Sequence, residues 1–232
     1  MLPRDVPQLE SFRIHHFNHP TRHVGGDFYD FLTLDSGELI GVLADVSGKG
    51  VPAALLASLL QGALHMEFRT SGRCDAVLNR INKLLCEKAV PGRFVTMFAT
   101  VLDPQGRGHY VSAGHNTAYV YRARTKEIEE LPSGGLIVGA FPFASYEGCP
   151  LQLADGDILV IYSDGLTEAE GPGDEMFGED RLREIIRSEA ASGSHRLERK
   201  ILEAMERFTR GMPQTDDITF VLLEKTAQDK EH

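Results

Sequence analysis

Residues 38–70, ELIGVLADVSGKGVPAALLASLLQGALHMEFRT, decide the fold of this chain. Residues 38–46 read as a strand that forms a hairpin with residues 27–34. Residues 47–50 form a glycine-rich turn, and Pro52 suits the first turn of a helix. The apolar residues that follow recur at steps of three and four, which predicts a largely buried helix. They are Leu55, Leu56, Leu59, Leu60, Ala63 and Leu64.

Outward from this stretch, apolar alternation predicts further strands and helical periodicity predicts further helices. Strands are expected at residues 11–18, 27–34, 94–102, 109–112, 118–122, 157–163 and 218–223, and helices at 75–88, 179–189 and 196–209. A hairpin turns at residues 35–37, and the strands between 94 and 122 form an antiparallel meander. Strands at both ends and helices in two blocks indicate a layered α+β sandwich. We expect one domain over residues 1–225 and a polar tail at 226–232.

Composition narrows the class of protein. The chain has 232 residues and a net charge of −10, which would repel the phosphate backbone of a nucleic acid. Its three cysteines form no CxxC pair, so neither a disulfide framework nor a zinc knuckle is expected, and a reducing cytoplasm fits. The apolar stretches are interrupted by polar residues before they could span a bilayer, and the N-terminus lacks a signal pattern. We therefore expect a cytoplasmic protein with no membrane segment and no nucleic-acid partner.

Four aspartates stand at the ends of apolar strands: Asp27, Asp45, Asp164 and Asp216. Any one of them, taken alone, is more readily explained as a turn or cap residue than as a ligand. Hard oxygen ligands of this kind suit Mg²⁺ or Mn²⁺, and a pair of such ions can activate a water and neutralise a phosphoryl group.

The order of the motifs around these aspartates resembles that of the metal-dependent protein serine/threonine phosphatases of type 2C (PPM), in the bacterial SpoIIE/RsbU-like branch. The resemblance runs from Leu2 to about Leu223. The motifs that carry it are VGGDFYD (24–30), ADVSGKG (44–50) with PAA (52–54), AGHN (113–116), GGL (134–136), YSDGLTE (162–168), FG (177–178) and DDIT (216–219). The fold it implies is a four-layer α-β-β-α sandwich, two antiparallel sheets flanked by helices.

The resemblance also implies site roles. Asp45 would bridge two metal ions, with the backbone carbonyl of Val46 on one of them. Asp164 and Asp216 would complete the other side, and Asp27 would act through metal-bound water. Asp217 is a further candidate, at a position where the broader family has Asn. Water held between the ions would attack phosphorus in line, without a phosphoenzyme.

The chain departs from the wider family at several positions. Ser47 stands where eukaryotic members have a general-acid histidine, so no general acid is assigned. His115 stands where the wider family has an Asp associated with a third metal, and it either touches substrate or caps a turn. Glu168 is a candidate ligand for such a third ion. Arg22 is either a phosphate-binding arginine or an exposed charge at a strand end.

Two other patterns are read as structural. The histidines near the N-terminus, His15, His16, His19 and His23, are expected to form a solvated strand face rather than a zinc cluster, because alternation separates His15 from His16. Residues 48–50 fail as a phosphate-binding P-loop, because Leu43 replaces its first glycine and Gly50 its Ser or Thr.

The function expected is metal-dependent hydrolysis of phosphoserine or phosphothreonine on a bacterial regulatory protein. In this branch such substrates are commonly anti-sigma-factor antagonists, and a sensor or receiver domain often precedes the phosphatase. A catalytically weak phosphatase-like module that only binds a partner is the alternative. A nucleotide-binding ATPase or kinase is disfavoured, because the P-loop fails and no HRD or DFG motif is present.

Overall fold

The computed structural model describes residues 6–21, 24–88, 92–173 and 175–227. Its strands are β1 (Phe12–His19), β2 (Phe28–Thr33), β3 (Leu39–Val46), β4 (Val95–Leu102), β5 (Arg107–Ala113), β6 (Ala118–Arg122), β7 (Glu127–Leu131), β8 (Cys149–Gln152), β9 (Ile158–Tyr162) and β10 (Ile218–Lys225). Its helices are α1 (Val51–Thr70), α2 (Cys74–Lys88), α3 (Asp164–Thr167), α4 (Gly178–Glu189) and α5 (Ser194–Thr209), with a 3₁₀ turn at Ala190–Ser192.

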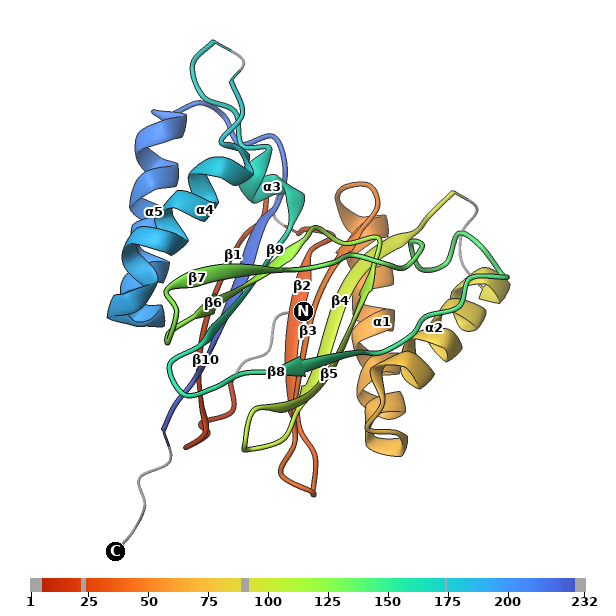
Figure 1. Cartoon of the computed structure of the whole chain (residues 1–232). Coiled ribbons are helices and arrows are strands. Elements are labelled where there is room, and N and C mark those ends of the chain that lie inside the picture. Colours follow the sequence, from red (N-terminus) through yellow and green to blue (C-terminus); the bar gives the residue numbers. More distant parts are fainter. Residues whose placement is uncertain (1–5, 22–23, 89–91, 174, 228–232) are drawn as a thin grey trace, which may run out of the picture.

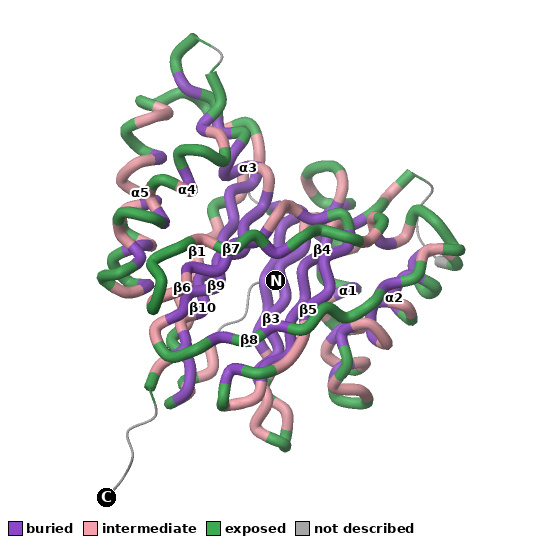
Figure 2. Tube along the Cα trace, viewed as in Figure 1, coloured by how far each residue is buried: buried purple, intermediate pink, exposed green. Residues whose placement is uncertain are grey.

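The strands form two five-stranded antiparallel sheets that pack face to face, in the orders β1-β10-β9-β6-β7 and β2-β3-β4-β5-β8. Helices α4 and α5 cover the first sheet, and α1 and α2 cover the second (Figure 1). Three apolar clusters fill the spaces between these four layers, and the buried trace follows the strands (Figure 2). The predicted four-layer α-β-β-α sandwich is therefore confirmed.

Strand β3 carries almost no polar side chain because both of its faces are covered. Ile40 and Val42 face the cluster beneath α1, whereas Leu39 and Leu43 face the cluster between the sheets. Side chains alternate across a strand, so a strand with both faces covered must be apolar at nearly every position. Asp45, near its end, is the exception.

The orientation of α1 differs from the prediction. The residues that it buries include Ala53, Ala57, Leu60 and Leu64, whereas Leu55 is 67% exposed. Small alanines let the helix approach the sheet closely, which turns part of the leucine stripe toward solvent. By length and composition alone α1, with a mean hydropathy of 1.2, could cross a membrane, but the core helix of a soluble protein meets the same criterion. Here α1 packs against β3 and α2.

The meander prediction was wrong at its third strand. β4 and β5 pair as expected, but β6 joins the opposite sheet, where it pairs with β7 and β9. The chain leaves β5 through Gly114, whose φ of 61° is a left-handed conformation that favours glycine. The second neighbour of β5 is β8, a short edge strand containing Pro150 that the sequence did not predict. The polar edge strand β7 and the one-turn helix α3 were also missed.

Candidate metal centre

The candidate aspartates gather at one edge of the sandwich because of strand direction. Asp45 lies near the end of β3, and Asp27 comes directly before β2, which pairs antiparallel with β3. Asp164 lies two residues after the end of β9, and Asp216 comes two residues before β10, its antiparallel partner. In each pair the end of one strand therefore lies beside the start of the other.

Asp27 connects the two sheets at this edge. Its side chain is buried, and its Oδ2 accepts a hydrogen bond of 2.6 Å from the hydroxyl of Thr219 on β10. Burial raises the pKa of Asp27 well above its usual value, and the nearby charge of Asp45 raises it further. These two carboxyl groups, one leading into β2 and one on β3, thus share a site that disfavours two negative charges.

Asp45 lies at the centre of the electrostatic coupling. Burial, followed by the charge of Asp164, raises the pKa of Asp45 to about 6, and a hydrogen bond with Asp27 opposes this shift. Burial and the charge of Asp216 likewise raise the pKa of Asp164. The pKa of Glu168 is also raised, first by burial and then by Asp164. Carboxylates from both sheets therefore repel one another across a common space.

Lys49 places a cation beside this cluster. Its Nζ lies 3.0 Å from Oδ2 of Asp216 and donates a hydrogen bond of 2.6 Å to the carbonyl of Thr215. Its charge opposes the rise in the pKa of Asp164. Lys49 was not predicted as a site residue, because its sequence context suggested only the failed P-loop motif. Its position four residues after Asp45 was the available signal.

The turn after β3 approaches two other segments closely. A Cβ added at Gly26 would lie 2.5 Å from the carbonyl oxygen of Val46, so only glycine fits there without displacement. Gly48 has a φ of 91°, and the Arg93 guanidinium occupies the space where a side chain at Gly48 would lie. Arg93 donates a hydrogen bond to the carbonyl of Ser47. The sequence analysis missed this arginine, which is 46 residues away from Ser47 along the chain.

Asp217 has a different environment from Asp216. Its Oδ1 accepts a hydrogen bond of 2.7 Å from the backbone N–H of Thr21, and its Oδ2 accepts one of 2.8 Å from that of Gly26. Both oxygens thus hold the loop that leads to Asp27, an arrangement that favours positioning over metal ligation.

His115 is buried rather than facing solvent. Its Nδ1 lies 3.0 Å from the hydroxyl of Thr96, which is paired in register with Asp45. Burial lowers the pKa of His115 to about 4, so the ring is neutral at physiological pH. It supports the strand beside Asp45, a role that neither sequence alternative described.

The other predicted residues near the N-terminus divide into two groups. Arg22 and His23 lie outside the described residues. His15, His16 and His19 each have a side-chain partner, respectively Glu198, Tyr29 and Gln214. His15 and His16 are half-buried, so the prediction of a wholly solvated histidine face was wrong for these two. Their partners come from segments distant in sequence, which alternation alone cannot reveal.

The donor set fits divalent cations of the Mg²⁺ and Mn²⁺ type. The converging side chains of Asp27, Asp45, Asp164 and Asp216 offer only carboxylate oxygens. The raised pKa values of Asp27, Asp45 and Asp164 show that negative charge is unfavourable at this place, and bound cations would offset that cost. Sequence reasoning had identified these four residues, and the structure brings them together.

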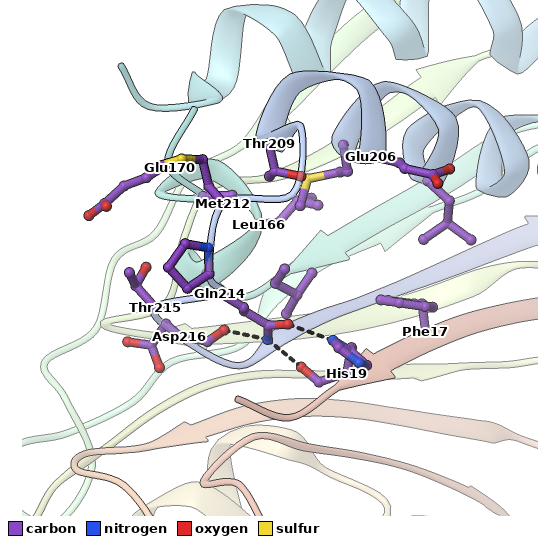
Figure 3. Close-up of a pocket in the computed structure, with 16 residues that line it drawn as sticks. Phe17, His19, Leu166, Glu170, Glu206, Thr209, Met212, Gln214, Thr215 and Asp216 are labelled. Carbon is purple, nitrogen blue, oxygen red and sulfur yellow. Dashed lines mark hydrogen bonds between the residues drawn. The ribbon is translucent and has the colours of Figure 1, made fainter. Parts of the chain in front are cut away.

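A cavity of about 560 Å³ opens beside this centre, with Asp216 and Gly165 among its lining residues. It lies beneath the loop between α5 and β10, as Figure 3 shows. Gln214 fixes this loop: its Nε2 donates hydrogen bonds of 2.7 and 2.6 Å to the carbonyls of His19 and Asp216.

Residues 35–226 match the family model described as Stage II sporulation protein E (SpoIIE). The phosphoserine phosphatase RsbU of Bacillus subtilis is 27% identical over 97% of this chain and 67% of its own length. The SiaA PP2C domain of Pseudomonas aeruginosa has a similar fold, with a TM-score of 0.80 at 22% identity over 92% of this chain and 85% of that one. The structure of the RsbU and RsbW domains of Rv1364c from Mycobacterium tuberculosis matches with a TM-score of 0.77 at 25% identity, and the match covers 94% of this chain and 60% of that one.

Proposed function

The chain belongs to the SpoIIE family of PP2C-type phosphatases, and from this premise we propose that it is a metal-dependent protein phosphatase that hydrolyses phosphoserine or phosphothreonine on a regulatory protein. The observation that carries this proposal is the gathering of Asp27, Asp45 and Asp164 at one edge of the two sheets, where burial and mutual repulsion raise their pKa values. Clustered carboxylates of raised pKa are characteristic of sites that bind cations or move protons.

Each acid is proposed to have a distinct role in holding two ions. Asp45, coupled to both Asp27 and Asp164, is suited to contact both ions, with the Val46 carbonyl on one of them. Asp164 and Asp216 would hold the second side, and Asp27, the most deeply buried, would orient water close by. When bound, such a pair of ions supplies an activated water and neutralises the phosphoryl oxygens.

The cationic side chain of Lys49 would act on the phosphate of the substrate. Lys49 contacts Asp216, and with that carboxylate bound to a cation, its ammonium is available to a phosphoryl oxygen. His115 is not the general acid, because its ring is buried and its pKa is about 4. The proton for the leaving serine oxygen is therefore assigned to water at the site.

The substrate proposed is a phosphorylated regulatory protein, such as an anti-sigma-factor antagonist. The relative named as a phosphoserine phosphatase supports phosphoserine over phosphotyrosine. The described cysteines, Cys74, Cys86 and Cys149, are free, which supports a reducing, cytoplasmic setting.

The test is phosphate release from a phosphoserine peptide, a phosphotyrosine peptide and ATP, each with Mn²⁺, with Mg²⁺ and with chelator. We expect metal-dependent release that is fastest from phosphoserine, and Asp45→Asn should remove most of it. Partner binding without turnover would instead support the phosphatase-like binding module. Preference for ATP or phosphotyrosine, or full activity in chelator, would overturn the proposal.

A further inference from the structure

The cavity beside Asp216 has predominantly apolar walls, to which β1, β10, α3, α5 and the loop between α5 and β10 contribute. Phe17 and Ile218 come from β1 and β10, and Leu202 and Met205 from α5; Leu166 adds a wall from α3. A space of about 560 Å³ lies within the usual size range of ligand sites. It is therefore large enough for a bulky side chain and part of its backbone.

The cavity borders the candidate metal centre, because Asp216 is both a lining residue and a candidate ligand, and the lining residue Gly165 directly follows Asp164. A phosphate at ions held by Asp164 and Asp216 would therefore lie close to this lining. In Figure 3, Thr215 and Asp216 lie at one side of the cavity, and Phe17 and Glu206 lie at the other. An extended chain advances about 3.3 to 3.6 Å per residue, so only the close neighbours of a phosphorylated residue can reach this space.

The charges around the cavity determine which side chains, close to the phosphorylated residue of a substrate, could bind in it. The charged side chains in its lining are the carboxylates of Glu170, Glu206 and Asp216, and His19 is held by Gln214. Among the lining residues that the structure describes there is no lysine or arginine, and Lys49, which contacts the lining at Asp216 and at the Thr215 carbonyl, is paired there. An acidic side chain would meet repulsion there, whereas an apolar one gains from burial against Leu202 and Met205.

We propose that this cavity is a substrate subsite that binds one large apolar side chain within about three residues of the phosphorylated residue. This inference rests on the proposed phosphatase function and adds to it the sequence preference of the substrate. The subsite selects leucine, methionine or phenylalanine at one such position and excludes aspartate and glutamate.

The experiment uses phosphoserine peptides with alanine at all flanking positions, in which leucine or aspartate is placed at each position from three before to three after the phosphoserine. We expect one leucine position to raise kcat/KM by about 10-fold or more over alanine. Aspartate at that position should lower kcat/KM, and Glu206→Lys should restore kcat/KM for the aspartate peptide.

Two matched variants connect this preference to the cavity. Thr209→Trp fills the cavity from α5. Ala204→Trp introduces the same side chain on the same helix, at a residue that lines a different pocket. Thr209→Trp should abolish the leucine preference while hydrolysis of p-nitrophenyl phosphate, which has no flanking side chain, is retained. Ala204→Trp should keep both.

The outcomes separate the two proposals. If the parent protein fails to hydrolyse p-nitrophenyl phosphate with Mn²⁺, the phosphatase function is wrong. If it does so but every flanking series is flat, or if Thr209→Trp keeps the full preference, the subsite is wrong. The peptide series on the parent protein decides this even where a variant folds poorly.

Discussion

Replacing Asp45 by Asn should stabilise the metal-free protein while removing its activity. The pKa of Asp45 rises from the usual 3.8 to about 6 in the folded state, mainly through burial and the charge of Asp164. A difference of about 2 pKa units corresponds to roughly 3 kcal/mol, which is an upper bound because Asp27 shares the same proton equilibrium. Asparagine keeps the shape of the side chain and carries no charge to desolvate.

The sign follows from proton linkage. Because the folded pKa lies above the unfolded one, the folded protein binds more protons between pH 3.8 and about 6, and its stability falls as the pH rises through this window. Above about pH 6 the full penalty applies, and below pH 3.8 it is absent. The benefit of Asp45→Asn should therefore be large at pH 7.5 and small at pH 4.

Urea unfolding in EDTA at both pH values measures this difference. At pH 7.5 we expect Asp45→Asn to raise the free energy of unfolding by up to about 3 kcal/mol, or the melting temperature by roughly 6 to 12 °C. Asp35→Asn, at an exposed turn residue, is the matched control and should change neither. Equal or lower stability of Asp45→Asn at pH 7.5 would refute the reasoning that clustered carboxylates strain the metal-free site.

Two further substitutions test the surroundings of the centre. Lys49→Met removes the ammonium that lies 3.0 Å from Asp216, so calorimetry should show Mn²⁺ binding tightened by up to about fivefold, with slower turnover; weaker binding would contradict a competing cation. Gly26→Ala places a methyl group 2.5 Å from the Val46 carbonyl and should weaken Mn²⁺ binding by about 10-fold or more, whereas Gly62→Ala, with open space around it, should not. Equal Mn²⁺ affinities of these two glycine variants would show that the Val46 carbonyl is not a metal ligand.

The sequence predicted the fold where burial alone decides structure. Strand β3 has both faces covered, and its residues, apolar except for Asp45 near the end, were correctly predicted to form a strand. The pairing of the third strand was predicted wrongly because the apolar pattern of β6 fits either sheet, and the chain crosses to the other sheet after Gly114. Helix α1 was predicted correctly, but its buried face was not, because the periodicity does not indicate whether the alanines or the leucines face the sheet.

The site was predictable to the extent that it depends on strand ends. Asp27, Asp45, Asp164 and Asp216 all stand there, and their motifs carried the resemblance. Residues that join the site through tertiary contacts were missed. Arg93, for example, reaches the Ser47 carbonyl from the loop before β4, and nothing in the local sequence indicates that contact.

The most direct test of the metal centre is anomalous diffraction at the manganese edge from crystals grown with Mn²⁺. Two-metal sites place their ions about 3.5 to 4 Å apart, so two peaks at this separation are expected. The Asp45 carboxylate should contact both, with Asp164 and Asp216 on one side and the Val46 carbonyl on the other. An absence of peaks among these residues at saturating Mn²⁺, or peaks bound elsewhere on the chain, would contradict the account.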